Sequence, residues 1–254
     1  MLLKRYTPYL SLVLAVGLAG CVWLRLLEIK SQLADFDEHI RTQVADKHFI
    51  VNLLHPVLTS EDIVYLMKLN PSRTEALPKV SRWFLDFHAD PAASPEQAAK
   101  TITFAMTFTP DQKLAAFDFS PLFLEMAPVA FLEASIRSLG QGKVDQGKKQ
   151  LKVDPEDLPK INAKLPSRKD IVAVLGPPVE QLADKDLQVL IYRFKADAKP
   201  TEPEHEKRRY AEAKLFFDPA NDELVRLAGR FVGLKLSIDY RKLRAPEAAA
   251  GKAH

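Results

Sequence analysis

The stretch TITFAMTFTPDQKLAAFDF, residues 101–119, contains the pattern that decides the fold. Two runs, 101–108 with three threonines and two phenylalanines and 113–119 with two phenylalanines, are separated by Thr109-Pro110-Asp111-Gln112. β-Branched and aromatic residues favour strands, and a proline followed by an aspartate is typical of a type I turn. The stretch therefore predicts a β-hairpin, the basic element of an antiparallel sheet.

The sequence on either side of this hairpin predicts further strands and two helices. Thr59 is a candidate helix N-cap, because acids follow it in the first turn and apolar residues recur at helical spacing. A longer helix is predicted to end at Gly140, a natural C-cap. Residues 24–29 fit either a strand or the last turns of a helix. The expected elements before residue 140 are a hairpin of strands at 39–44 and 48–54 around residues 45–47, a strand at 81–88, a helix that follows Thr59 and ends at Asn70-Pro71, and a helix at 121–139.

The second half of the chain shows the same order of predicted elements. Ser167 precedes a short helix, 170–175, and strands are expected at 187–194, 211–218, 223–227 and 230–240. At a spacing of about 107 to 110 residues, Asp62-Ile63-Val64 matches Asp170-Ile171-Val172. The sequence leaves open whether this reflects a divergent internal repeat or a coincidence between common patterns.

The expected fold class is therefore α+β, with two small units that each pack a helix on an antiparallel sheet. The proposed boundaries are a signal peptide at 1–20, an N-terminal unit at 21–153, a C-terminal unit at 160–244 and a disordered tail at 245–254. A proline-containing acidic stretch, residues 154–159, is the expected linker.

The N-terminus has the three-part layout of a secretory signal: Lys4 and Arg5, a hydrophobic run from about Tyr9 to Ala19, then small residues. Its end, Leu18-Ala19-Gly20-Cys21, resembles the lipobox of bacterial lipoproteins. That resemblance implies cleavage between Gly20 and Cys21 and acylation of Cys21. Several acyl chains hold a protein durably in a membrane. Because Val22 rather than aspartate follows the cysteine, the resemblance also implies the outer membrane.

An uncleaved anchor is the alternative interpretation of the same segment. From Tyr6 to Leu24 there are 19 residues without a charge, close to the roughly 20 needed to span a bilayer. The chain would then be anchored in the inner membrane by residues 6–24. Both interpretations place most of the chain outside the cytoplasm.

The run SRKDIVAVLGPP, residues 167–178, is followed by a strand that ends Tyr192-Arg193-Phe194. It resembles the small outer-membrane-assembly lipoprotein family, the BamE-like or SmpA/OmlA domain, in which a capped helix ends in Leu-Gly-x-Pro before an antiparallel sheet. The resemblance covers roughly residues 160–240, and more faintly 55–120. Members are typically much smaller, and Pro177 stands where their pattern is variable. The resemblance implies partner binding rather than catalysis and assigns no binding residue.

Candidate chemical groups are few. The net charge is +3 and Lys4 and Arg5 lie in the predicted signal, so no basic surface for nucleic acid is expected. His39, His48 and His55 match no recognised zinc spacing. A cell-wall hydrolase would require clustered carboxylates, for which Asp86, Asp118 and Glu125 are the candidates. Residues 202–209, which contain three glutamates followed by Lys-Arg-Arg, are expected to form a solvated loop, or a contact for lipid headgroups or for a partner's charged face.

Together these features predict a lipid-anchored protein on the periplasmic face of the outer membrane. We expect a non-enzymatic interaction module in outer-membrane assembly or maintenance, with an envelope protein as partner and with no catalytic residue, cofactor or metal. The alternative function is a lipoprotein that binds a lipid or small apolar ligand between the sheet and the helix at 121–139.

Overall fold

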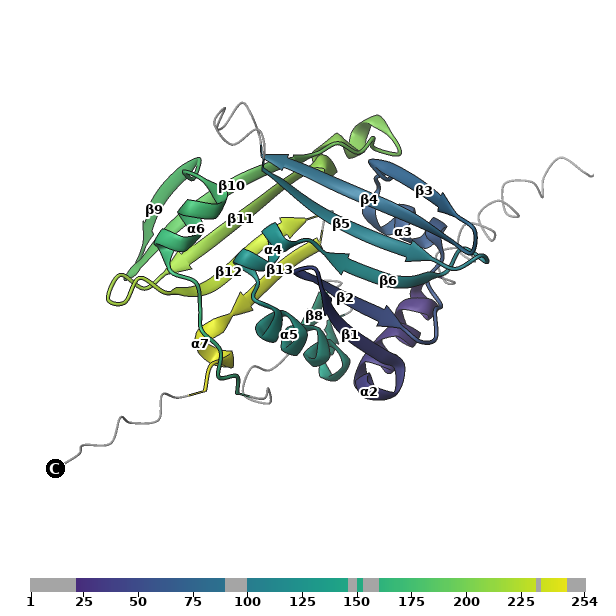
Figure 1. Ribbon diagram of the computed structural model, residues 1–254, viewed down its shortest axis with the longest axis horizontal. Helices are drawn as coiled ribbons and strands as arrows, with labels where there is room; N and C mark the ends of the chain where they lie inside the picture. The colour runs from purple at the N-terminus through teal and green to yellow at the C-terminus, as the bar shows by residue number, and fades with distance from the viewer. Residues whose placement is uncertain (1–21, 90–99, 146–149, 153–159, 232–233, 246–254) are drawn as a thin grey trace, which may run out of the picture.

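The computed structural model describes residues 22–89, 100–145, 150–152, 160–231 and 234–245. Most of them belong to one antiparallel sheet that curls into a half-barrel (Figure 1). Along the sheet the strands follow the order β1 (Ile40–Ala45), β2 (His48–Leu53), β6 (Leu114–Phe119), β5 (Thr101–Phe108), β4 (Val80–Ala89), β10 (Leu187–Ala196), β11 (Tyr210–Phe217), β12 (Leu224–Phe231) and β13 (Leu234–Asp239). Two short strands, β3 (Arg73–Leu77) and β9 (Glu180–Asp184), pair with β4 and β10.

The prediction of two separate helix-on-sheet units is wrong. The two halves of the chain do repeat an order of helix, short strand and three longer strands, but these strands join into a single sheet. The junction is the pairing of β4 with β10, in which Phe87, His88 and Ala89 lie opposite Ala196, Lys195 and Phe194. On the edge of β4 that meets β10, residues Val80–Phe84 pair with β3. On the edge of β10 that meets β4, residues Leu187–Ile191 pair with β9. The halves therefore share one curled sheet instead of each forming a unit of its own.

The hairpins follow from local sequence. Strands β5 and β6 form the hairpin expected from residues 101–119, and Gln112 in its turn has a positive φ of 59°. Strands β1 and β2 form the hairpin expected around residues 45–47, with φ positive at Asp46 and Lys47. A turn with two such residues matches the right-handed twist of the flanking strands.

Helices α3 (Ser60–Met67) and α6 (Arg168–Leu175) both begin with a capping box. The side chain of Thr59 accepts a hydrogen bond from the Asp62 amide, and Asp62 accepts one from the Thr59 amide; Ser167 and Asp170 do the same in α6. Each box satisfies two backbone amides that would otherwise lack a partner at a helix start. The remaining helices are α2 (Phe36–His39), α4 (Pro121–Met126), α5 (Val129–Gln141), the 3-10 helix η3 (Pro203–Arg209) and α7 (Tyr240–Leu243).

Two sequence-based helix assignments need correction. The helix expected at 121–139 is split into α4 and α5, because Pro128 cannot donate a backbone hydrogen bond within a continuous helix. Gly140 is not the C-cap but lies inside α5, which ends at Gln141. Residues 22–34, left open between strand and helix at 24–29, are helical.

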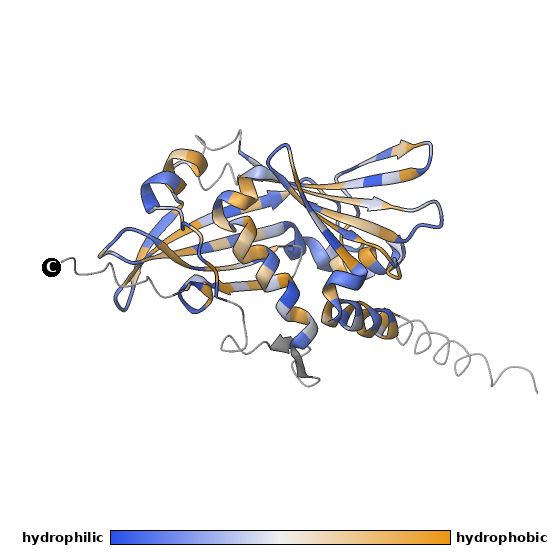
Figure 2. Ribbon diagram, turned by 60° about the horizontal axis from the view of Figure 1, so that its bottom comes forward, coloured by the Kyte–Doolittle hydropathy of each residue, from blue (hydrophilic) through white to orange (hydrophobic). Residues whose placement is uncertain are grey.

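The inner face of the curled sheet holds the main hydrophobic core. Helices α4 and α5 lie inside the curl (Figure 2), where Phe123 and Phe131 are fully buried. Phe104 of β5 contacts the rings of five other phenylalanines, with centroids 5.1 to 6.0 Å apart; these are Phe87, Phe117, Phe119, Phe123 and Phe231. Phe87 and Phe231 come from opposite sides of the β4–β10 junction, so this cluster packs the two halves against each other.

Strand β7 (Lys143–Asp145) pairs with β8 (Gln150–Lys152) apart from the main sheet.

Candidate functional site

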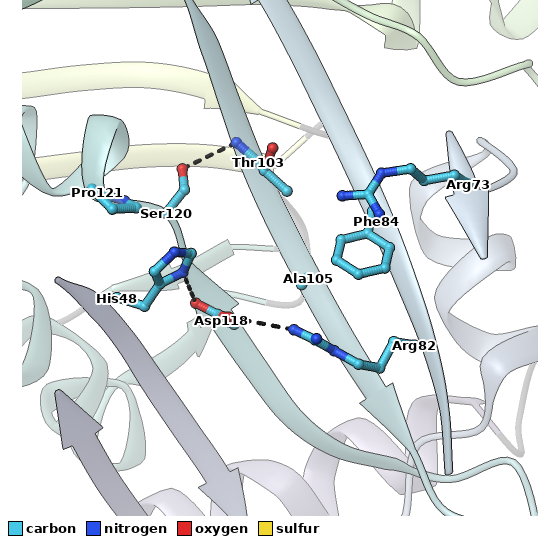
Figure 3. A pocket seen from close by; sticks show the side chains of 9 residues that line it. All are labelled: His48, Arg73, Arg82, Phe84, Thr103, Ala105, Asp118, Ser120 and Pro121. Atoms are coloured by element: carbon cyan, nitrogen blue, oxygen red, sulfur yellow. Dashed lines mark hydrogen bonds and ion pairs between the residues drawn. The ribbon is translucent and has the colours of Figure 1, made fainter. Parts of the chain in front are cut away.

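A pocket of about 290 Å³ opens on the outer face of the sheet (Figure 3). Its lining comes from strands β2 to β6 and from the start of α4; the residues are His48, Arg73, Arg82, Phe84, Thr103, Ala105, Asp118, Ser120 and Pro121. Side chains alternate between the two faces of a strand. Because Phe49, Leu85, Phe104 and Phe119 point into the core, their neighbours along the strands point outward into this pocket.

Asp118 of β6 contacts both His48 of β2 and Arg82 of β4, on the two sides of the pocket. Its Oδ1 accepts a hydrogen bond from Nδ1 of His48 at 2.8 Å, and its Oδ2 lies 3.9 Å from Nη2 of Arg82. Only 14% of the Asp118 side chain is exposed, against 37% for His48 and 36% for Arg82. The histidine is therefore held in place by a strong hydrogen bond, whereas the Arg82 guanidinium is held only by a longer ion pair.

Phe84 lies beneath the two arginines of the pocket, Arg73 and Arg82. The Arg73 guanidinium lies 3.4 Å from the centre of the Phe84 ring, and that of Arg82 lies 5.1 Å from it. Arg73 is fixed by a hydrogen bond from Nε to Asp86 at 3.0 Å. Asp86 also accepts a hydrogen bond from the Thr103 hydroxyl at 2.7 Å. Arginine and aromatic residues are enriched at protein interfaces, and here both arginines also pair with carboxylates, Arg73 with Glu75 and Asp86 and Arg82 with Asp118.

The Ser120 hydroxyl at this pocket is hydrogen-bonded to the backbone of β5. Ser120 lies near the His48–Asp118 pair, but its hydroxyl oxygen accepts a hydrogen bond from the Thr103 amide at 3.0 Å. Among the described residues no hydrogen bond joins Ser120 to His48, as activation of a serine nucleophile by a base requires. The partly exposed groups are the guanidinium groups of Arg73 and Arg82 and the His48 imidazole, which suit the recognition of a carboxylate or another anion, whereas the Phe84 ring beneath them is only 6% exposed.

The structure brings two of the three histidines considered for zinc together and places the third, His48, elsewhere. Nδ1 of His39 lies 2.9 Å from Nδ1 of His55, so one ring donates a hydrogen bond to the other. His48 lies at the other end of the β1–β2 hairpin, in the outer-face pocket. Within the part of the chain that the structure describes, no group of three or more histidine, cysteine, aspartate or glutamate side chains is placed to hold a metal ion.

Two of the three candidate carboxylates lie at the outer-face pocket and the third does not. Asp118 lines the outer-face pocket and Asp86 borders it, and both are engaged by arginines. Glu125 lies on α4 and is exposed. Sequence reasoning did not single out Arg73, Arg82 or Phe84, although alternation within residues 80–89 would have placed Arg82, Phe84 and Asp86 on one face.

The remaining predicted features are only partly described. The charged block at 202–209 forms η3 and borders a second pocket of about 310 Å³, lined by Glu204, His205, Lys207, Arg208 and Arg230. The predicted cleavage and lipidation residues, Gly20 and Cys21, lie outside the described residues, as do most of the alternative anchor, the predicted linker and nearly all of the tail. No helix in the described part of the chain has both the length and the apolar character to cross a bilayer.

The space that a lipid or apolar ligand would use, between the sheet and residues 121–139, is occupied by the protein's own side chains. Phe123 is 2% exposed, and Met126 and Phe131 are 0% exposed. The core therefore offers the alternative function no support.

No family model, no curated protein and no solved structure matches this chain. The lipobox and the BamE-like resemblance accordingly stay predictions from the sequence.

Proposed function

We propose that this chain is a lipid-anchored protein of the bacterial envelope that binds a partner protein through the outer face of its sheet. In this proposal Cys21 carries the anchor, the body lies on the periplasmic face of the outer membrane, and the protein serves envelope assembly or maintenance without catalysing a reaction. The observation that carries the binding role is the outer-face pocket, where Arg73 and Arg82 flank Phe84.

The chemistry of this pocket specifies what the partner presents. Arg82 is the pocket cation with the weaker internal pairing, since Asp118 lies 3.9 Å away whereas Arg73 makes 3.0 Å contacts to both Glu75 and Asp86. A partner carboxylate that reaches Arg82 would form a charge-assisted hydrogen bond over an aromatic surface. We therefore expect an acidic side chain of the partner at this position.

Photo-crosslinking in living cells tests the binding role. Thr107 lies on the outer face directly opposite Arg82 and is half-buried, so a photoreactive amino acid there would border the pocket. We expect an adduct with one defined envelope protein, which Arg82→Glu abolishes by charge repulsion. The matched control is Arg193→Glu, which reverses an outer-face arginine on the other half of the sheet, bound to Glu180 and Glu212.

The test variant and its matched control together give the experiment a definite outcome. An adduct that survives Arg82→Glu, or that disappears equally with Arg193→Glu, would show that the pocket does not select the partner. The anchor is tested separately by the intact mass of the N-terminal peptide from membrane-extracted protein. A peptide that begins at Cys21 and carries acyl chains supports the lipoprotein, and an unmodified peptide that retains Met1 contradicts it.

A further inference from the structure

The first two turns of the helix at 22–34 expose large apolar side chains. Trp23 is 40% exposed, Leu24 66% and Leu27 40%. We propose that these three residues, the apolar tip, insert into the interfacial layer of the membrane and hold the body directly against the lipid surface. This inference rests on the membrane anchoring proposed above and adds a second, non-covalent contact with the same membrane.

Helical spacing puts the apolar tip on the side of the helix that faces away from the body. Residues three or four positions apart share a helix face, as Trp23 and Leu24 do with Leu27. The opposite face packs on the protein: Val22 is 9% exposed, and Leu26, Ile29 and Leu33 pack against the main core. Beyond Leu27 the outward positions become polar, with Glu28 and Ser31 exposed. The exposed apolar surface is thus confined to the end of the helix next to the predicted anchor.

The helix is fixed to the body along its whole length. At its start, Nη2 of Arg25 binds Oδ1 of Asp62, whose side chain is only 3% exposed, at 2.5 Å. In its fourth turn, the Gln32 side-chain amide donates a hydrogen bond to the His55 carbonyl at 2.9 Å. Near its end the helix meets Gly140 of α5, where an added Cβ would lie 2.3 Å from backbone atoms of Leu33 and Ala34. A lipid attached at Cys21 would therefore connect to a rigid body without a flexible linker.

The neighbouring sequence favours a lipid surface as the occupant over a partner protein. Trp23 and Leu24 are the last two residues of the uncharged run that begins at Tyr6, and Arg25, the charged residue that separates them from Leu27, binds Asp62. Tryptophan is enriched at the membrane interface, because one edge of its ring is polar and the rest apolar. Figures 1 and 2 place the start of this helix at one end of the molecule, beside the β5–β6 turn. That end would face the membrane.

Tryptophan fluorescence in vesicles tests the proposal with the full chain. The chain has two tryptophans, Trp23 and Trp83, and Trp83 packs against Phe108 with ring centroids 4.7 Å apart. The membrane-extracted protein is reconstituted into vesicles of phosphatidylethanolamine and phosphatidylglycerol that carry a spin-label quencher at acyl carbon 5 or 12. Subtracting the quenching of Trp23→Phe from that of the unmodified protein isolates Trp23 without altering the core.

We expect the shallow quencher to act on Trp23 about two-fold more strongly than the deep one, because an interfacial helix lies roughly 5–10 Å into the boundary layer. Leu24→Glu should reduce this quenching, whereas Leu182→Glu, at a leucine 47% exposed on β9, should not. Quenching that is absent, or strongest from carbon 12, while the protein still floats with the vesicles would overturn the apolar tip but not the anchor. Failure of the protein to float with the vesicles would overturn the proposed anchoring and, with it, this inference.

Discussion

Replacement of Asp62 by asparagine should loosen the attachment between the helix at 22–34 and the body. Asparagine keeps the shape of the side chain and an oxygen that can accept the Thr59 amide, so the cap of α3 is largely retained. What is lost is the negative charge opposite Arg25. Removing one partner of a fully buried ion pair costs about 3–5 kcal/mol. Because 33% of the Arg25 side chain is exposed and water can solvate it, we expect about 1–3 kcal/mol.

The loss should depend on pH. Burial acts to raise the pKa of Asp62, but hydrogen bonds from Arg25 and Thr59 outweigh it and hold the pKa below the ordinary value of 3.8. The ionised carboxylate therefore stabilises the fold above the pKa of the unfolded chain, and this contribution disappears as the pH falls through the lower pKa of the folded state. The Asp62→Asn variant should be less stable than the unmodified protein at pH 7, and the difference should shrink steadily below pH 3.8.

Urea unfolding of the full chain in non-ionic detergent, followed by circular dichroism at several pH values, measures this difference. The matched control is Asp170→Asn, which changes the equivalent capping box of α6 at an exposed aspartate. Its hydrogen-bond partner is Ser167 rather than an arginine, so its cost should stay below about 1 kcal/mol. Equal losses in the two variants at pH 7, or an Asp62→Asn loss that is unchanged in acid, would refute the assigned role of the Arg25–Asp62 pair.

Two further substitutions test the packing around α5 and α7. Gly140→Ala places a methyl group 2.3 Å from the backbone of Leu33 and Ala34, so it should displace the helix at 22–34 and cost about 1–3 kcal/mol in urea unfolding; an unchanged midpoint would argue against this close contact. Tyr240→Phe removes a 2.6 Å hydrogen bond to the Met126 carbonyl and should cost about 1–3 kcal/mol, whereas Tyr210→Phe, at a residue 45% exposed, should cost almost nothing. Burial raises the pKa of Tyr240, so the fold should lose stability as the pH rises above the ordinary tyrosine value of 10.0, and the Tyr240→Phe variant should lose less over the same range.

Much of the local structure could be predicted from the sequence, because the signals that fix it lie close together. The turns at 45–47 and 109–112 define two hairpins, and Thr59 and Ser167 begin the helices they were expected to cap. The errors arose where a distant contact or a single residue decides the structure. Pro128 divides a helix that the apolar spacing of residues 121–139 made look continuous.

The joining of the two halves could not be predicted, because it depends on which strand edges meet. The β4–β10 pairing uses residues that are common in any strand. Nothing in the sequence around Phe87 and Phe194 indicates whether these strands pair within one half of the chain or between the halves. The candidate site was missed for a similar reason. His48 and Asp118 are 70 residues apart and meet only because β2 pairs with β6. The sequence had singled out His48, Asp86 and Asp118 separately, and the alternation within β4 was the signal for Arg82 and Phe84 beside them.

The order of strands in the sheet also has a consequence for folding kinetics. Hairpins such as β5–β6 form from local contacts alone. Residues 87–89 of β4 can pair only after residues 194–196 of β10 reach them, and closing the long loop between these two segments is slow. Before this pairing forms, an unpaired strand edge can associate with other chains. Strand β3 pairs locally with Val80–Phe84 of β4, and β9 pairs locally with Leu187–Ile191 of β10. The two short strands thus cover half of each edge before the late, non-local pairing completes the sheet.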